Sequence, residues 1–173
     1  MSGVLLRPAR AEEVPLMQAL ELDAAKSYAQ LPGYDFSVGL AARTDAEHQQ
    51  VRETGAAIVA ETSAGVCGFI LVLPLDGRGH IFEAAVAAEM QGRGIGRQLV
   101  AAAEDYARVK GYAEMTLTTY RDVPWNAPFY ARLGYELLEP CPDRPELQAL
   151  MAGEFCLGYC EQPRVAMRKL LAA

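Results

Sequence analysis

The sequence predicts a mixed α/β fold in which a central sheet of about six to seven strands carries helices on both faces. Two segments rich in strand formers, 56–62 and 66–73, flank a short turn and predict an antiparallel hairpin in the N-terminal part of the sheet. A further strand-like segment, 80–86, runs into a glycine-rich turn and then into an amphipathic helix. Strand and helix patterns alternate from there onward, and a length of 173 residues suits a single domain spanning 1–173.

The segment before the hairpin predicts one strand and two helices. Apolar residues over 4–7 indicate a short strand. A helix is expected over 12–28, where Pro15 fits the first turn. Turn-forming residues over 31–37 indicate a loop, and a second helix is expected at 37–50.

The segment after the glycine-rich turn predicts two more strand–helix alternations and a final strand. The first helix has apolar residues at spacings of four and three along one stripe: Ile95, Leu99, Ala102, Tyr106 and Val109. Lys110 and Gly111 supply a basic last turn and a glycine stop. The remaining expected elements are strands at 113–120, 135–139 and 164–170 and short helices at 125–133 and 146–152.

Composition argues against several classes of protein. A formal net charge of −6 argues against general nucleic-acid binding. No apolar run approaches the roughly 18 residues of a membrane span, and the N-terminus lacks the apolar stretch of a signal peptide. We therefore expect a cytoplasmic protein with no membrane and no nucleic-acid partner. The four cysteines form no Cys-x-x-Cys pair and lie far from both histidines, so we expect free thiols and no metal site.

The glycine-rich turn, Gln91-Gly92-Arg93-Gly94-Ile95-Gly96, predicts a phosphate-binding site. Glycines let a ligand approach the backbone, and a helix N-terminus offers free N–H groups with partial positive charge. This combination binds phosphate or pyrophosphate, and Arg93 and Arg97 could add charge-assisted contacts. A Walker loop is absent, and position 97 is Arg where a dinucleotide fingerprint needs a third glycine. An ATP- or dinucleotide-dependent enzyme is therefore the less favoured interpretation.

Two motifs together resemble the GNAT superfamily of N-acetyltransferases. Residues 91–96 fit its phosphate motif, Gln/Arg-x-x-Gly-x-Gly/Ala, at every position. Further along, Phe129-Tyr130-Ala131-Arg132-Leu133-Gly134-Tyr135 matches its second motif, in the right order and at the right distance. The resemblance covers roughly residues 1–140 and the final strand. It implies a GNAT-like sheet that is splayed where acyl-CoA binds, with acetyl-CoA as co-substrate and no metal.

The resemblance also implies which residues hold the CoA. The amides of the glycine turn would accept the pyrophosphate, and backbone groups at the end of the preceding strand would bind the pantetheine arm. Many members have a CoA-contacting asparagine seven residues before the tyrosine, where this chain has Val123; Asn126 could substitute or could only cap the short helix. The implied cofactor-binding residues are Val86, Ala87, Gln91, Gly92, Arg93, Gly94, Ile95, Gly96, Arg97, Asn126, Phe129 and Tyr130.

Tyr130 and Glu83 are the expected catalytic residues. Tyr130 matches the family tyrosine that protonates the CoA sulfur, and a phenol with a pKa of about 10 stays protonated at neutral pH and can donate as the thiolate forms. Glu83 lies on the strand entering the glycine turn, where members often place a carboxylate, and could deprotonate the amine directly or through water. His80 is the alternative base, because imidazole titrates near neutrality; on a regular strand the two side chains would point to opposite faces.

The resemblance implies direct transfer of an acetyl group from acetyl-CoA to a primary amine in a ternary complex. A small-molecule acceptor is expected, a protein or peptide amine is the other acceptor class, and the family allows a homodimer. Tyr28, Tyr34 and Phe36 fall where members build the acceptor pocket, so they would either line it or pack on the core. The alternative function is a non-catalytic acyl-CoA-binding sensor or regulatory module.

Overall fold

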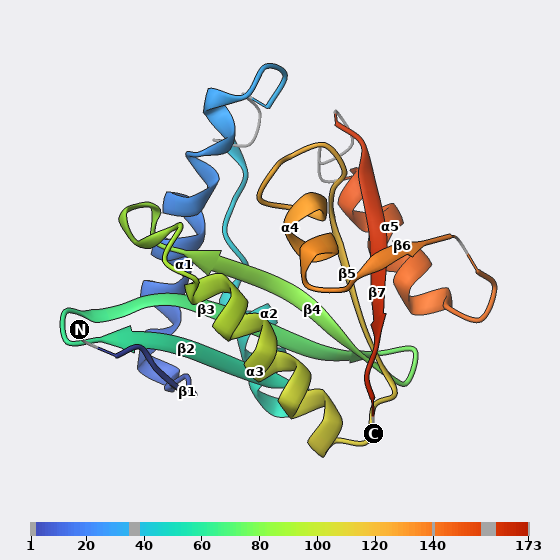
Figure 1. Ribbon diagram of the computed structural model, residues 1–173, viewed down its shortest axis with the longest axis horizontal. Coiled ribbons are helices and arrows are strands. Elements are labelled where there is room, and N and C mark those ends of the chain that lie inside the picture. The colour runs from blue at the N-terminus through green and yellow to red at the C-terminus, as the bar shows by residue number, and fades with distance from the viewer. Residues whose placement is uncertain (1–2, 35–38, 140, 157–161, 173) are drawn as a thin grey trace.

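The computed structural model describes residues 3–34, 39–139, 141–156 and 162–172 (Figure 1). Within these ranges seven strands form one sheet in the order β1-β2-β3-β4-β5-β7-β6. The strands are β1 (Leu5–Pro8), β2 (Ala56–Thr62), β3 (Gly65–Leu75), β4 (Arg78–Val86), β5 (Glu114–Tyr120), β6 (Glu136–Leu138) and β7 (Arg164–Leu170). The α-helices are α1 (Val14–Ala25), α2 (Asp45–Thr54), α3 (Ile95–Val109), α4 (Ala127–Arg132) and α5 (Pro145–Cys156). The expected mixed α/β architecture is confirmed.

The sheet parts between β4 and β5. Strands β1 to β4 pair antiparallel, as predicted for the N-terminal part, whereas β4 and β5 are parallel. Their pairing joins only 79–81 of β4 to 115–117 of β5. Beyond these residues β4 runs on to Val86 beside β3, and β5 runs on to Tyr120 beside β7. The splay implied by the family resemblance is therefore present, and Figure 1 shows β4 and β5 separating.

Helices cover both faces of the sheet. On one face α1 and α2 pack on an apolar core whose members include Met17, Leu20, Val51, Val59, Phe69, Leu71 and Ala85. On the other face α3 and α4 pack on a second core, which includes Ile70, Val72, Ile81, Leu99, Ala103, Met115, Leu117 and Ala127. None of the helices in the described ranges is long and apolar enough to cross a membrane.

The buried face of α3 differs from the expected stripe at its C-terminal end. The buried apolar residues of this helix are Ile95, Leu99, Val100, Ala103 and Ala107. Four of them follow one row at a spacing of four, a ridge that packs well against a neighbouring surface. Val109, expected on the stripe, is 86% exposed. The prediction was wrong there because the two small alanines, and not the larger residues beside them, face the sheet.

The second helix begins later than the predicted 37–50. Thr44 and Glu47 form a capping box: the Glu47 N–H donates to Thr44 Oγ1 at 3.2 Å, and the Thr44 N–H donates to Glu47 Oε2 at 2.7 Å. This reciprocal cap fixes the start of α2 at Asp45. The first helix is also shorter than 12–28, because separate 3-10 turns at Ala11–Glu13 and Tyr28–Gln30 flank it.

Helix α5 extends beyond the expected 146–152 and is capped by a distant turn. The side chain of Asp76, in the β3–β4 turn, accepts the N–H groups of Glu146 and Leu147 at 2.9 and 3.0 Å. The Glu146 carboxylate accepts the Asp76 N–H in return. This contact joins α5 to the far end of the β3–β4 hairpin.

Two histidines are buried in the fold. His48 of α2 is 0% exposed, and neither ring nitrogen has a hydrogen-bond partner among the described residues. His80 of β4 is 1% exposed, and its Nδ1 lies 2.9 Å from Thr116 Oγ1. Burial lowers the pKa of His48 and lowers the pKa of His80 to about 3. Both rings are therefore neutral in the folded protein at neutral pH.

We expect the two buried histidines to contribute a loss of stability as the pH falls from neutrality to 5. In the unfolded chain both histidines take up a proton below a pKa of about 6.5. In the folded protein burial lowers the pKa of His48 and lowers that of His80 to about 3, so protonation of these rings favours unfolding. The loss begins near pH 6.5 and reaches at most about 1.4 kcal/mol per pH unit for each histidine. Urea unfolding at several pH values measures the slope. Between pH 7 and pH 5 the variant His48→Leu should lose less stability than the wild-type protein, and an equal change in both would contradict the account for this residue.

Candidate functional site

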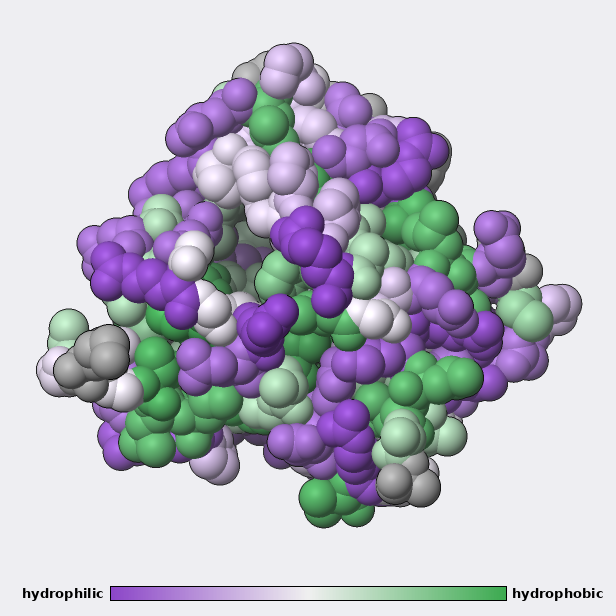
Figure 2. All heavy atoms as spheres, viewed as in Figure 1, coloured by the Kyte–Doolittle hydropathy of each residue, from purple (hydrophilic) through white to green (hydrophobic). Residues whose placement is uncertain are grey.

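Two cavities open where β4 and β5 part. An outer groove of about 490 Å³ lies between the end of β4, the glycine turn and α4. An inner cavity of about 150 Å³ lies between α1, β4 and β5. The residues that line both are Ala24, Tyr28, Ala84, Ala85, Asn126 and Tyr130. The two cavities therefore meet at these side chains, and Figure 2 shows this face of the molecule hollowed near the end of β4.

The glycine turn has the backbone that a phosphate loop needs. Gly92 and Gly94 have φ values of 74° and 79°, a left-handed conformation that other residues adopt at a cost. A Cβ on either would meet open space, so the turn presents its backbone outward. Gly94 is the N-cap of α3, which places the free N–H groups of that helix at the groove. The Gln91 side chain ties the turn to β4 by donating to the Val86 carbonyl at 3.1 Å.

Most of the predicted cofactor-binding residues gather at the outer groove. Those that line it are Val86, Gln91, Gly92, Gly94, Ile95, Gly96, Arg97, Asn126, Phe129 and Tyr130. Arg132 and Trp125, which the sequence reasoning left out of the set, line it as well. Arg97 and Arg132 are exposed and bring positive charge to the groove. The charge and backbone geometry fit an anionic ligand at the N-terminus of α3.

Ala87 and Arg93 fall outside the residues that line the groove. The Ala87 N–H donates to the Cys67 carbonyl at 2.9 Å, and its own carbonyl accepts the Met90 N–H at 2.8 Å. Both backbone groups of Ala87 are thus used within the protein. The backbone that faces the gap is that of β4 before this residue, from 82 to 86.

Tyr130 and Asn126 stand at the junction of the two cavities. Burial and the negative charge of Glu83 raise the pKa of the Tyr130 phenol, so its proton is retained at neutral pH. Asn126 is 8% exposed, and its Oδ1 accepts a 3.0 Å hydrogen bond from the Tyr28 hydroxyl. This bond orients the amide. Asn126 also precedes α4, but its side chain makes no capping hydrogen bond there.

A β-bulge brings Glu83 to the inner cavity. Ile81 pairs with Val72 and Glu83 pairs with Leu71, so Phe82 has no partner on β3. The extra residue reverses the alternation of side chains beyond it, and Glu83 therefore faces α1 instead of α3. Its carboxylate lies 3.3 Å from Arg43 Nε and accepts the Ala84 N–H at 3.1 Å.

His80 does not reach the site. The bulge places it on the same face as Glu83, which corrects the expectation of opposite faces. Its ring is nevertheless buried beside Thr116 and lines neither cavity. With a pKa lowered to about 3 by burial, the ring is also too weak a base for this chemistry. His80 is therefore removed as the alternative base.

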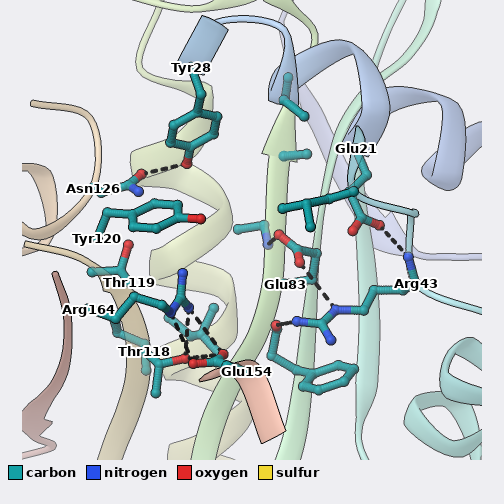
Figure 3. Close-up of a pocket in the computed structure, with 18 of the residues that line it drawn as sticks. Glu21, Tyr28, Arg43, Glu83, Thr118, Thr119, Tyr120, Asn126, Glu154 and Arg164 are labelled. Atoms are coloured by element: carbon teal, nitrogen blue, oxygen red, sulfur yellow. Dashed lines mark hydrogen bonds and ion pairs between the residues drawn. The ribbon is translucent and has the colours of Figure 1, made fainter. Parts of the chain in front are cut away.

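Glu21 is a cavity residue that the sequence reasoning missed. It projects from α1, and its Oε2 accepts the backbone N–H of Arg43 at 3.0 Å (Figure 3). Burial, and next the negative charge of Glu83, raise the pKa of Glu21 to about 8. One signal was available: Glu21 follows Met17 by four residues and thus falls on the apolar face of the helix, where a carboxylate is costly.

The opposite wall of the inner cavity holds a paired carboxylate. Glu154 of α5 is 6% exposed and accepts hydrogen bonds from Arg164 Nε at 3.0 Å and Thr118 Oγ1 at 2.6 Å. The Arg164 guanidinium also lies over the Tyr120 ring, 4.8 Å from its centroid. No local pattern could identify this pair, because its members come from separate elements.

The predicted aromatic cluster is partly described. Tyr28 lines both cavities and stacks on Tyr34, with ring centroids 6.1 Å apart. Tyr34 is itself buried against Tyr120. Phe36 lies outside the described residues. Among those that are described, no group of three or more His, Cys, Asp or Glu side chains is placed to hold a metal ion.

Solved structures with this fold include several acetyltransferases. N-acetylglutamate synthase from Neisseria gonorrhoeae, complexed with coenzyme A and N-acetyl-glutamate, matches with a TM-score of 0.71 at 16% identity, over 100% of this chain and 36% of that one. The ribosomal-protein-S18-alanine N-acetyltransferase from Escherichia coli matches with a TM-score of 0.68 at 14% identity, over 99% and 96% of the two chains. The PaiA N-acetyltransferase from Thermoplasma acidophilum, in complex with coenzyme A, matches with a TM-score of 0.65 at 14% identity, over 97% of this chain and 99% of that one. At these identities the likeness concerns the fold.

Sequence comparison adds a curated relative and a family. N-alpha-acetyltransferase 80 from Mus musculus is 44% identical over 55 residues, which are 32% of this chain and 16% of that protein. The match therefore spans a small part of its length. The sequence profile of the Acetyltransferase (GNAT) family matches residues 17–135, which include the glycine turn and Tyr130. The chain belongs to the GNAT acetyltransferase family.

Proposed function

We propose that this protein transfers an acetyl group from acetyl-CoA directly to a primary amine, with both substrates bound at once. One observation carries the proposal: the groove at the glycine turn and the acidic inner cavity meet at Tyr130. A thioester that entered from the groove and an amine that entered from the cavity would come together at that side chain. This arrangement serves direct transfer and requires no nucleophilic cysteine.

The outer groove is proposed to hold the CoA portion. Its pyrophosphate fits the amides of the glycine turn at the N-terminus of α3, with Arg97 and Arg132 adding positive charge. The pantetheine arm fits along β4 up to Val86, where no strand pairs on the β5 side. Solved structures of the same fold that hold coenzyme A include the two complexes described above. Phe129 and Asn126 complete the lining, and Ala87 has no backbone group left for a ligand.

Tyr130 is proposed as the acid and a carboxylate of the inner cavity as the base. The phenol is protonated at neutral pH, so it can give its proton to the sulfur as the C–S bond breaks. The amine must first lose a proton, and Glu83 faces the cavity on the strand that leads to the glycine turn. Acyl transfer thus needs no metal ion at this site.

The acceptor is proposed to be a small molecule. The inner cavity has a volume of about 150 Å³, which suits a compact amine. A protein or peptide amine is the other acceptor class, because structures of this fold include an enzyme named for a ribosomal protein. A cytoplasmic location and a homodimer stay predictions from the sequence.

Replacing Tyr130 tests the proposed activity. We expect Tyr130→Phe to lower kcat for amine acetylation by about 10²-fold or more, because the sulfur loses its proton donor. Thiol release from acetyl-CoA, measured over a panel of amines and peptides, gives the rate, and calorimetry gives the affinity for CoA. Tyr106→Phe, on α3 and outside both cavities, is the matched control.

Two outcomes would count against the transferase proposal. If Tyr130→Phe keeps the full rate, the acid role fails. If the wild-type protein binds CoA and acetylates no amine in the panel, the acyl-CoA sensor becomes the better account.

Replacing glycines separates backbone strain from ligand binding. Gly94→Ala and Gly111→Ala both place a Cβ at a φ of 77–79° with no atom nearby, so each should lower the free energy of unfolding by about 1–2 kcal/mol. Only Gly94 belongs to the groove, and only its variant should also weaken CoA binding. Equal CoA affinities in the two variants would argue against a phosphate site at the turn. Chemical denaturation and calorimetry provide the two measurements.

A further inference from the structure

Glu21 and Glu83 face the inner cavity from opposite elements. Glu21 comes from α1 and Glu83 from β4, and Figure 3 shows Arg43 reaching both carboxylates. The two contacts differ in kind. The Arg43 guanidinium lies 3.3 Å from Glu83, whereas Glu21 accepts the Arg43 backbone N–H. Among the described residues the guanidinium also pairs with Glu47 of α2, at 3.3 Å.

The charged groups around Glu21 disfavour its ionised form. Burial raises the pKa of Glu21 most, and the like charges of Glu83 on β4 and Glu47 on α2 raise it further. Arg43, through its backbone N–H and its charge, lowers it. The balance brings the pKa of Glu21 to about 8. A carboxylate of that basicity accepts a proton from an ammonium group more readily than an ordinary carboxylate does.

We propose that Glu21 binds the ammonium group of the acceptor and takes its proton, while the Glu83–Arg43 ion pair holds the opposite wall in place. This assignment rests on the proposed acetyltransferase function and moves the role of base from Glu83 to Glu21. Asn126 supplies a second indication of a ligand: it is 8% exposed, and with Oδ1 engaged by Tyr28 its amide group lines both cavities. A bound acceptor or thioester carbonyl can accept from that amide.

The proton balance of the reaction is then complete. Glu21 removes one proton from the ammonium, and the free amine nitrogen forms a bond to the thioester carbonyl carbon. As the C–S bond breaks, Tyr130 protonates the sulfur, and the second proton of the nitrogen restores the phenol. Glu21 returns its proton to solvent. The products are the acetylated amine, CoA with a free thiol, and one proton.

The charges of the cavity also indicate the class of acceptor. Its described lining contains the carboxylates Glu21, Glu83 and Glu154 and the guanidinium groups Arg43 and Arg164. Arg43 pairs with Glu83, and Arg164 pairs with Glu154 at 3.0 Å. Above its pKa of about 8, where Glu21 is ionised, the charge left over in this lining is that of Glu21. The cavity therefore favours an amine that enters as a cation and has no carboxylate near the amino group.

Propylamine and β-alanine form a matched pair of probes. Both have three carbon atoms and a primary amino group, and in β-alanine a carboxylate replaces the terminal methyl group of propylamine. We expect kcat/KM to be at least 10-fold higher for propylamine, with 1,4-diaminobutane as a second cationic probe. Equal values for propylamine and β-alanine would overturn the assignment of acceptor class.

Glu21→Gln tests the proton acceptor through the pH profile. For the wild-type protein, kcat/KM for propylamine should rise with pH through about 8, because Glu21 must be ionised. In Glu21→Gln we expect kcat/KM at pH 8 to fall at least 10-fold and the rise of kcat/KM with pH, the ascending limb of the profile, to disappear. The affinity for CoA should stay unchanged. Glu21→Asp, which keeps a carboxylate, should recover part of the rate. Glu12→Gln, an exposed site just before α1, is the matched control.

The outcomes separate this assignment from the function on which it rests. A wild-type rate and pH limb in Glu21→Gln would overturn the role of Glu21 alone. Loss of the limb in Glu83→Gln, with Glu21→Gln unaffected, would return the role to Glu83. Failure of the wild-type protein to acetylate any amine would overturn the proposed function. In that case calorimetry of propylamine with the CoA-bound protein tests whether Glu21 binds the ammonium group. Unchanged affinity for propylamine in Glu21→Gln would overturn that role.

Discussion

The parting of β4 from β5 is the constraint on which both cavities depend. A parallel pair that continued past 81 and 117 would close the gap and consume the backbone groups that face it. The gap persists because each strand is held on its other side: β4 pairs with β3 up to Val86, and β5 pairs with β7 along its whole length. The unpaired backbone of β4 must find partners in water or in a ligand. The sheet therefore offers a strand-like binding edge without losing its own register.

The bulge at Phe82 determines that the Glu83 carboxylate lies beside this edge. Without the extra residue, Glu83 would point toward α3, where the neighbouring side chains of β4 enter an apolar core. With it, Glu83 turns toward α1 and the loop that carries Arg43, while Ala84 and Ala85 keep the space beside it open. A single inserted residue thus moves a carboxylate from a core position, where its charge would be costly, to a cavity.

Local signals predicted much of the fold and the groove, and distant contacts account for the rest. The glycine turn and the start of α3 were predictable because the conformation of Gly94 and the helix pattern after it depend on neighbours in the chain. The predicted start of α2 was wrong, although Thr44 and Glu47 have the spacing of a capping box. The cap on α5 joins residues 70 positions apart in the chain, so no window of sequence contains it. Glu154 and Arg164 lie ten positions apart, but on a helix and a strand whose packing no local pattern predicts. No residue type at or beside Phe82 indicates the bulge. The prediction that His80 and Glu83 point to opposite faces was wrong for this reason.

The fold holds its buried and half-buried carboxylates in two different ways. Glu154 has a guanidinium and a hydroxyl at hydrogen-bonding distance, and Glu114 is held by Arg144, so burial of these charges is compensated locally. For Glu21 no ion pair occurs within the described ranges; it receives one backbone N–H and lies near a like charge. Stability alone would favour an apolar side chain at this position on the helix. A carboxylate kept there, beside a cavity that joins the groove at Tyr130, is better explained by what enters the cavity than by the fold.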